Sequence, residues 1–199
     1  GIISRYWEFD GGIPSTSTDI NPIIMYNTAG KYKVKLIAGN ILNSDTIIKD
    51  TIIEVFPSVS SKTFLIEDWE WLSDIENSYW FVNNFDSQVS WELASLGYSS
   101  SKSIYISNLN NPKKQIDEIV SRPIDLNAIS NLELSFKYAY AKTNNSNTDK
   151  LKILVSSDCG DSWSVRKTLY SSQLNSYSDT ISTEFSPSSD LEWKSVSIY

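Results

Sequence analysis

Two groups of carboxylates are the side chains in this sequence best suited to acid–base chemistry or to metal binding. The first group comprises Glu67, Asp68, Glu70, Asp74 and Glu76, and the second comprises Asp117 and Glu118. Two carboxylates held at the proper separation can hydrolyse a glycosidic bond. Carboxylate oxygens are also the hard ligands that Ca²⁺ prefers. Because the Glu-x-Asp-x-x-Glu strand typical of many glycosidases is absent, we favour calcium binding, with a solvated acidic surface as the simpler alternative.

Residue types that the sequence lacks exclude several classes of active site. The 199 residues include no histidine, which excludes a Ser-His-Asp triad, a Cys-His pair, a His-Glu-x-x-His zinc site and a 2-His-1-carboxylate iron site. Cys159 is the single cysteine, so these residues can form neither an internal disulfide nor a multi-cysteine metal site. With 17 basic and 24 acidic side chains the net charge is −7, and no basic cluster offers a surface for nucleic acid.

The aromatic content of the sequence is high, at 13%. A flat ring exposed to solvent can stack on a sugar ring, so we consider five aromatic side chains as candidate ligand-binding residues: Trp69, Trp71, Tyr79, Trp91 and Tyr98. Trp69 and Trp71 would share one face if their segment is extended. The alternative is that most of these rings fill the core, since large aromatic side chains usually supply burial.

The elements that must position these side chains are strands. Apolar residues recur with a period of two, as in residues 31–38, where they alternate with lysines. The pattern predicts strands at 31–38, 46–55, 103–107, 118–121, 132–140, 151–155 and 191–199. No segment has the period of a long amphipathic helix, and the apolar runs are too short to span a bilayer. The sequence therefore predicts an all-β protein of packed β-sandwiches.

A segment rich in proline and serine divides the sequence. An apolar strand ends at Val55, Pro57-Ser-Val-Ser-Ser-Lys62 follows, and a new aromatic run comes after it. This composition predicts two domains, at residues 1–56 and 63–199, joined by a linker at 57–62. Stretches rich in Asn and Ser at 143–148 and 171–179 are predicted to be exposed connections within the second domain.

Three motifs of the first domain follow one another in a fixed order. They are Trp7-Glu-Phe-Asp-Gly-Gly-Ile-Pro14, the segment from Ser15 to Pro22, and Tyr26-Asn-Thr-Ala-Gly-Lys-Tyr-Lys-Val-Lys-Leu36 leading to Asn40. In this order they resemble a PKD-type domain, which implies a small immunoglobulin-like β-sandwich that acts as a spacer. Members of that family have further strands before the Trp-x-Phe strand. The resemblance therefore implies that N-terminal strands are missing and that this sequence is a fragment of a longer polypeptide.

The second domain carries a longer series of short motifs. They are Phe64-Leu-Ile-Glu67, the strand at Trp80, residues 99–106, Ile119-Val-Ser-Arg-Pro-Ile-Asp-Leu126, residues 132–140 and 151–157, and Asp158-Cys-Gly-Asp-Ser-Trp163. The series is similar to MAM-like jelly-roll modules, including the cleaved-adhesin and choice-of-anchor modules of bacterial surface proteins. This resemblance implies a jelly-roll β-sandwich whose C-terminal strands are missing. It also implies a structural Ca²⁺ whose ligands would be Glu67, Asp117 and Glu118.

Residues 156–163 fit the Asp-box pattern, Ser-x-Asp-x-Gly-x-Ser/Thr-Trp, with Ser156, Asp158, Gly160 and Trp163 at its defining positions. In this motif the Asp side chain accepts hydrogen bonds from turn N–H groups, Gly adopts a strained dihedral and Trp packs over the hairpin. Propellers such as sialidases repeat the box in successive blades, whereas it occurs here once. We therefore interpret it as a structural turn.

Three Asp-Thr-Ile triplets look like the acceptor sequence of bacterial periplasmic O-glycosylation. The acceptor side chains would be Thr46, Thr51 and Thr180. Modification requires that these hydroxyls be exposed. The same triplets also arise by chance in strands, so exposure is the property to examine.

A PKD-type domain followed by such a jelly roll resembles the C-terminal accessory region of pappalysin-like zinc metalloproteases and of adhesins exported by type IX secretion. We expect a non-catalytic accessory or adhesion region of a secreted or outer-membrane surface protein. Its partner would be a carbohydrate or an extracellular protein, with the secretion machinery as a further contact. The alternative is the accessory tail of a metalloprotease whose zinc site lies upstream, since this fragment has no histidine for one. Neighbouring segments or a partner chain are expected to cover the open sheet edges.

Overall fold

The computed structural model describes residues 2–55, 65–75, 78–84, 86–112, 114–127 and 129–199, apart from the side chains of Thr51 and Glu54. The predicted linker at 57–62 lies outside the described residues, and so does Glu76 of the first acidic group. Two compact units make up the chain, Gly1–Lys62 and Thr63–Tyr199. Nearly all of the regular structure is β, in several antiparallel sheets, which confirms the predicted all-β class and is consistent with a β-sandwich.

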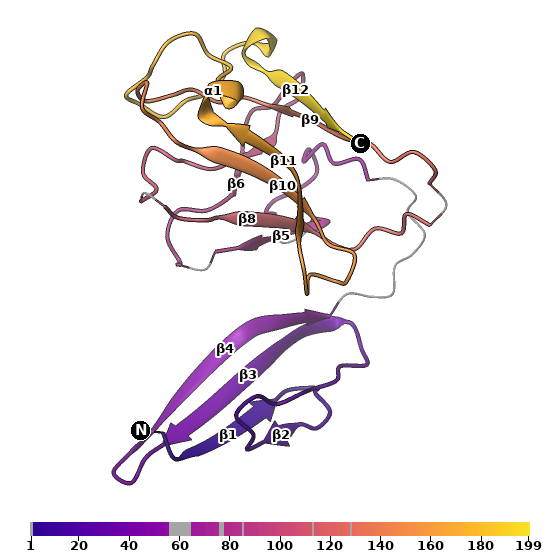
Figure 1. The fold of residues 1–199 in the computed structure, drawn as a ribbon, viewed down its shortest axis with the longest axis vertical. Helices are drawn as coiled ribbons and strands as arrows, with labels where there is room; N and C mark the ends of the chain where they lie inside the picture. Colours follow the sequence, from indigo (N-terminus) through magenta and orange to yellow (C-terminus); the bar gives the residue numbers. More distant parts are fainter. Residues whose placement is uncertain (1, 56–64, 76–77, 85, 113, 128) are drawn as a thin grey trace. The chain divides into compact units, whose positions relative to one another are not determined.

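The first unit contains one four-stranded antiparallel sheet. Its strands are β1 (Ser4–Phe9), β2 (Thr16–Ser17), β3 (Gly30–Gly39) and β4 (Ser44–Val55), in the order β2-β1-β3-β4. The N–H of Ile3 donates to the carbonyl of Gly39 at 2.8 Å, so the start of the chain lies beside the β3–β4 turn (Figure 1). β4 has twelve residues and is the longest strand in the described part of the chain. Because it ends the strand order, it is also one of the two edge strands of this sheet.

The two faces of this sheet differ in the way that the alternating sequence predicts. In β3 the side chains of Tyr32, Val34 and Leu36 are half-buried, whereas Lys31 and Lys33 are exposed. Register places Trp7 opposite Leu36 and Phe9 opposite Val34, so apolar side chains from β1 and β3 meet on one face. Phe9 is the buried centre of this face, with 6% of its surface exposed.

The second unit is built from four two-stranded antiparallel sheets rather than from one continuous sheet. β5 (Trp80–Asn83) pairs with β8 (Glu118–Ser121), and β6 (Glu92–Ala94) pairs with β7 (Ser103–Tyr105). β9 (Leu134–Tyr138) pairs with β12 (Lys194–Ile198), and β10 (Lys150–Val155) pairs with β11 (Ser164–Tyr170). Short strands leave much of this unit in loops, which are held by main-chain bonds such as that from Ser176 to Tyr140 and by side-chain contacts.

Among the residues that the structure describes, helical structure is confined to two short turns of the second unit. α1 (Ser171–Leu174) follows β11 directly, and a 3₁₀ turn, η1 (Asp190–Glu192), precedes β12 (Figure 1). Leu174 of α1 and Leu169 of β11 are buried, each with 5% of its surface exposed. α1 contacts both β10 and β11. The helix therefore covers one end of the β10–β11 hairpin.

Candidate functional site

The best-defined surface site of the second unit is built around residues 97–102, which we name the serine loop. The N–H of Gly97 donates to the carbonyl of Ser100 at 3.1 Å, which closes a tight turn just before β7. A Cβ at position 97 would lie 2.2 Å from the carbonyl oxygen of Lys102, so only glycine fits. The turn exposes three consecutive serines, Ser99, Ser100 and Ser101.

A carboxylate from a distant segment holds one side of the serine loop. Glu70 accepts hydrogen bonds from the N–H of Ser101 at 2.7 Å, from the N–H of Lys102 at 3.2 Å and from the Ser101 hydroxyl. The bonds from Ser101 lower the pKa of Glu70. In return, Lys102 Nζ donates to the carbonyl of Leu72 at 2.5 Å. The serine loop and residues 70–72 are thus joined by both a carboxylate and an ammonium group.

Trp71 lies between these two attachment points and points into solvent. Its surface is 94% exposed, although both neighbouring residues are held to the serine loop. Trp69 instead packs against Trp80, with ring centroids 6.1 Å apart, and is half-buried. The segment turns here, with a Leu72 N–H to Trp69 carbonyl bond of 3.3 Å. Trp69 and Trp71 would share one face only if this segment were extended. Because the segment turns instead, that condition is not met.

A second carboxylate holds the opposite side of the serine loop. Asp190, in η1, accepts hydrogen bonds from the N–H of Ser99 at 3.0 Å and from its hydroxyl at 2.6 Å. These bonds, with a smaller contribution from Lys137, lower the pKa of Asp190. Ser99 has a positive φ of 47°, a conformation that non-glycine residues adopt only when their surroundings fix it. The Asp190 carboxylate supplies that restraint.

Aromatic side chains also lie on the Asp190 side of the loop. The ring of Tyr98 meets Trp193 edge to face, with centroids 6.4 Å apart. Lys137 Nζ lies 4.3 Å from the centroid of the Tyr98 ring, within the range of a cation–π contact. Tyr98 is 37% exposed. The site thus presents a highly exposed indole, Trp71, beside the serine loop and a partly exposed phenol, Tyr98, within it.

The serine hydroxyls and the two carboxylates of this site are all engaged in hydrogen bonds within the chain. The hydroxyls of Ser99 and Ser101 donate to carboxylates, and that of Ser100 donates to the carbonyl of Lys102 at 3.1 Å. Both carboxylates have lowered pKa values, so at neutral pH they are ionised acceptors and poor general acids. The indole face of Trp71, on the turn held by Glu70 and Leu72, is the surface of this site that is open to a ligand.

The other two candidate aromatic side chains hold the structure together. Tyr79 donates its hydroxyl proton to the carbonyl of Pro123 at 2.7 Å, and Trp91 donates its indole N–H to the carbonyl of Asp117 at 3.1 Å. Both rings are half-buried. Of the five aromatic side chains singled out from the sequence, the structure therefore places only Trp71 and Tyr98 at an exposed site.

The predicted calcium ligands each have a partner within the chain. Glu67 accepts from the N–H of Trp69 at 3.1 Å, Asp117 accepts from the amide of Asn111 at 2.6 Å, and Glu118 accepts from the amide of Asn83 at 3.2 Å. Among the residues that the structure describes, no three Asp, Glu or Cys side chains come together as a metal-binding group. Calcium binding by these residues stays a prediction.

The Asp-box residues form the tip of the β10–β11 hairpin. Asp158 accepts hydrogen bonds from the N–H of Ser162 at 2.9 Å and from the hydroxyls of Ser162 and Ser156, at 2.5 and 2.7 Å. These bonds, first of all that from the Ser162 hydroxyl, lower the pKa of Asp158 to about 2. Gly160 has a φ of +93°, and Trp163 donates its indole N–H to the Gly160 carbonyl at 3.1 Å. Every one of these contacts is within the turn.

The triplets that look like O-glycosylation acceptors lie in different settings. Thr46 is an exposed residue of β4, and Thr180 is exposed beside an isolated bridge to Lys142. The side chain of Thr51 lies outside the described residues. Thr46 and Thr180 therefore meet the requirement of exposure, and their modification stays a prediction.

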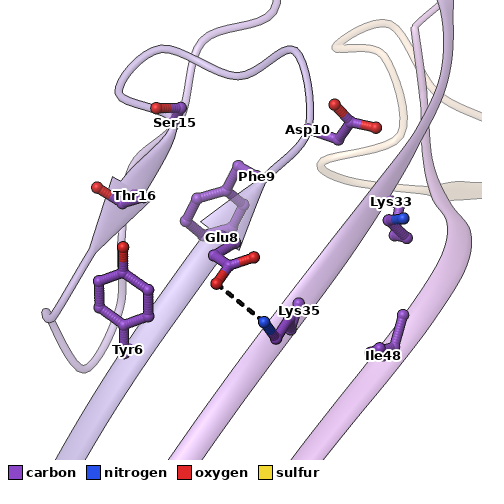
Figure 2. Close-up of a pocket in the computed structure, with 9 residues that line it drawn as sticks. All are labelled: Tyr6, Glu8, Phe9, Asp10, Ser15, Thr16, Lys33, Lys35 and Ile48. Carbon is purple, nitrogen blue, oxygen red and sulfur yellow. Dashed lines mark hydrogen bonds and ion pairs between the residues drawn. The ribbon is translucent and has the colours of Figure 1, made fainter.

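The first unit has a shallow open pocket that sequence reasoning did not single out. It lies over β1 and β3, and its lining residues include Tyr6, Asp10, Lys33 and the pair Glu8 and Lys35 (Figure 2). Glu8 and Lys35 are directly opposite in register and form an ion pair of 3.0 Å. The alternating lysines of β3 are the signal that could have predicted such a cross-strand pair. Because its central charges satisfy each other, this pocket supports ligand binding less well than the serine loop.

Comparison of the chain with models of protein families, with curated proteins and with solved structures finds no match. The PKD-type and MAM-like resemblances therefore stay predictions, based on the motifs alone. Within the described residues, no helix has the length and apolar character needed to cross a membrane.

Proposed function

We propose that residues 63–199 act as a non-catalytic binding module of a secreted or cell-surface protein, and that the ligand is a carbohydrate. The observation that carries this proposal is Trp71, an indole 94% exposed to water on a turn that is fixed from both sides. An indole this exposed leaves its ring faces in contact with water, and covering them with a partner would be favourable. Residues that bind in this way are usually presented on loops held by a rigid scaffold.

A sugar ring is the ligand that fits this site best. The C–H groups on one face of a pyranose carry partial positive charge, and the face of an indole ring is negative. Near Trp71 the hydroxyls of Ser99 and Ser101 are already paired with the carboxylates of Asp190 and Glu70, so a neutral ligand stacked on the indole would not have to break these contacts. Fixing the turn in advance reduces the entropy lost on binding.

The first unit would serve as a spacer in this proposal. The PKD-like motifs and the continuous sheet of the first unit support that role. A single exposed ring gives weak affinity, which several copies of a module in one protein would raise by avidity.

Affinity electrophoresis tests the proposal. The chain is run through gels containing soluble β-glucan, xylan, mannan or hyaluronan, and at least one of these polysaccharides is expected to slow its migration. The substitution Trp71→Ala should abolish that retardation. Trp163→Ala is the matched control, because Trp163 is also an exposed tryptophan, 46% exposed, but belongs to the Asp-box hairpin. Equal retardation of both variants, or migration unaffected by every polysaccharide, would disprove the proposal.

A further inference from the structure

β4 presents an unusual surface for the edge strand of a small sheet. It is twelve residues long, and within the described part of the chain no strand pairs with its outer edge. Three of its isoleucines are more than half exposed: Ile47 at 51%, Ile48 at 52% and Ile52 at 59%. Long apolar edge strands pair readily with other strands, and most proteins protect them with charges, proline or bulges.

The sequence of β4 places isoleucines on both of its faces, among charged residues. The tetrapeptide Asp-Thr-Ile-Ile occurs twice, starting at Asp45 and at Asp50. Because side chains alternate between faces, a repeat of five residues places equivalent residues on opposite faces. Ile47 therefore lies on the face that carries Leu36, its register partner in β3, while Ile48 lies on the opposite face with Lys35. A partner strand at this edge would cover isoleucines on both faces.

We propose that the outer edge of β4 pairs antiparallel with β4 of a second copy of this chain, with Ile47 of the two copies directly opposite each other. A twofold axis perpendicular to the sheet generates this arrangement and joins two four-stranded sheets into one. The inference concerns the first unit and does not rest on the proposed carbohydrate site.

Charge selects this register over its neighbours. With Ile47 at the axis, Asp45 of each copy is opposite Lys49 of the other, which gives two pairs of opposite charge. Axes at Lys49 or at Asp50 would instead place two like charges directly opposite each other, which is destabilising. An axis at Ile48 would place Lys49 opposite Ile47 and leave the charge unpaired. Asp45 and Lys49 are both exposed, and although Asp45 Oδ1 accepts from the N–H of Thr46 at 2.8 Å, its other oxygen can face Lys49 of the second copy.

Within the strand, the same register covers isoleucines on both faces. Ile47 meets Ile47 of the other copy on one face, and Thr46 comes opposite Ile48 on the other face. The pairing thus accounts for the exposure of Ile47 and Ile48, which are 51% and 52% exposed.

The first test uses charge reversal and self-association measured by sedimentation equilibrium. Wild-type protein is expected to dimerise reversibly, and Lys49→Asp should weaken the dimer about tenfold or more, since two attractive pairs become repulsive. The double variant Asp45→Lys, Lys49→Asp should restore it. Lys33→Asp changes the net charge by the same amount but lies on β3, so as a control it should leave the dimer unchanged. A wild-type chain that stays monomeric, or a double variant as weak as Lys49→Asp, would overturn the proposal.

The second test locates the axis by cross-linking in a Cys159→Ser background. Directly opposite residues in antiparallel strands have Cβ atoms about 4.5–5.5 Å apart, close enough for a disulfide after small shifts. Ile47→Cys should therefore give covalent dimers under mild oxidation. Asp50→Cys should not, because the two substituted positions would be six residue steps apart, about 20 Å. Cross-linking of both variants at the same rate would contradict the register, whatever the oligomeric state.

Discussion

The two units of this protein use different means to fix their strands. In the first unit, β3 and β4 pair from Gly30 opposite Val55 to Gly39 opposite Ser44, in one long main-chain ladder with a single irregularity. In the second unit, the β6–β7 pair covers only three residues on each strand. There, side chains connect segments far apart in sequence, as Asp190 does with Ser99, 91 residues away.

This difference explains why the candidate binding site lies in the second unit. A ladder spreads its hydrogen bonds over many equivalent residues, and it presents flat faces and edges. Side-chain attachments such as Glu70 to Ser101 fix individual loops, and a fixed loop can present one side chain in a defined direction. The first unit is therefore suited to spacing and edge pairing, and the second to recognition.

The largest expected effect comes from removing the buried centre of the first unit. Phe9 is 6% exposed, and Phe9→Ala should lower the stability of the first unit by about 3–5 kcal/mol, from lost burial and the cavity left behind. Hydrogen–deuterium exchange followed by mass spectrometry should show lost protection in β1, β3 and β4 and retained protection in β9 to β12. Phe9→Leu is the milder control. Unchanged protection in β3 would contradict a sheet organised around Phe9.

A smaller effect is expected from a substitution in the serine loop. In Gly97→Ala the new Cβ would lie 2.2 Å from the Lys102 carbonyl oxygen, so the main chain must shift. We expect a loss of about 1–3 kcal/mol, as for other overpacked sites, measured by urea unfolding of the second unit. Ser100→Ala, in the same loop, should have little effect. If Gly97→Ala is as stable as the wild type, the serine loop can adjust and is not rigid. That result would contradict the view that side-chain attachments fix the loops of the second unit.

A local effect is expected in the Asp-box hairpin. Gly160 has a φ of +93°, which costs a residue with a Cβ about 1 kcal/mol, while the added Cβ would lie 3.6 Å from the Trp163 ring, an ordinary contact distance. Gly160→Ala should therefore destabilise the second unit by about that amount in urea unfolding, with Asp161→Ala as the neighbouring control. A loss well above this would show that the turn supports more than its own hairpin.

The smallest effect is a dependence of the same hairpin on acid. The pKa of Asp158 falls from 3.8 to about 2 because the Ser162 and Ser156 hydroxyls and the Ser162 N–H bind its ionised form. A lowered carboxyl pKa adds stability that is fully present above pH 3.8 and is lost as the pH falls through about 2. A carboxyl titration by NMR should show this midpoint, and Ser162→Ala should raise it. An Asp158 that titrates at its ordinary value would mean that these hydrogen bonds are not formed in solution.

Strand positions followed from the sequence with good accuracy. The segment predicted at 118–121 is β8, the segment at 31–38 lies within β3, and that at 132–140 contains β9. These strands are half-buried, and a half-buried strand must alternate polar and apolar residues, so the pattern is visible locally. β6 and β11 were not among the predicted strands: β6 has only three residues, too few to show a period, and the first four residues of β11 are all exposed. Of the segment predicted at 191–199, residues 194–198 form β12, while η1 ends at Glu192.

The candidate site followed from the sequence only in part. Trp71 and Tyr98 were among the predicted ligand-binding residues, but so were Trp91 and Tyr79, whose polar atoms bond to main-chain carbonyls instead. Glu70 was grouped as a metal or catalytic carboxylate, whereas its partners are Ser101 and Lys102. The roles of Asp190 and Ser99 went unrecognised, since no local pattern relates two residues 91 positions apart.

By itself, the sequence determined that these 199 residues are all-β and hold no histidine-based active site, because both properties depend on residue types and on their spacing over a few positions. Only the tertiary structure decided which aromatic ring is exposed and which carboxylate holds which loop. It also decided that β4, with isoleucines on both faces, lies at the edge of its sheet. Those properties depend on which distant segments meet, and the free energy of such contacts is shared among residues that the sequence does not place together.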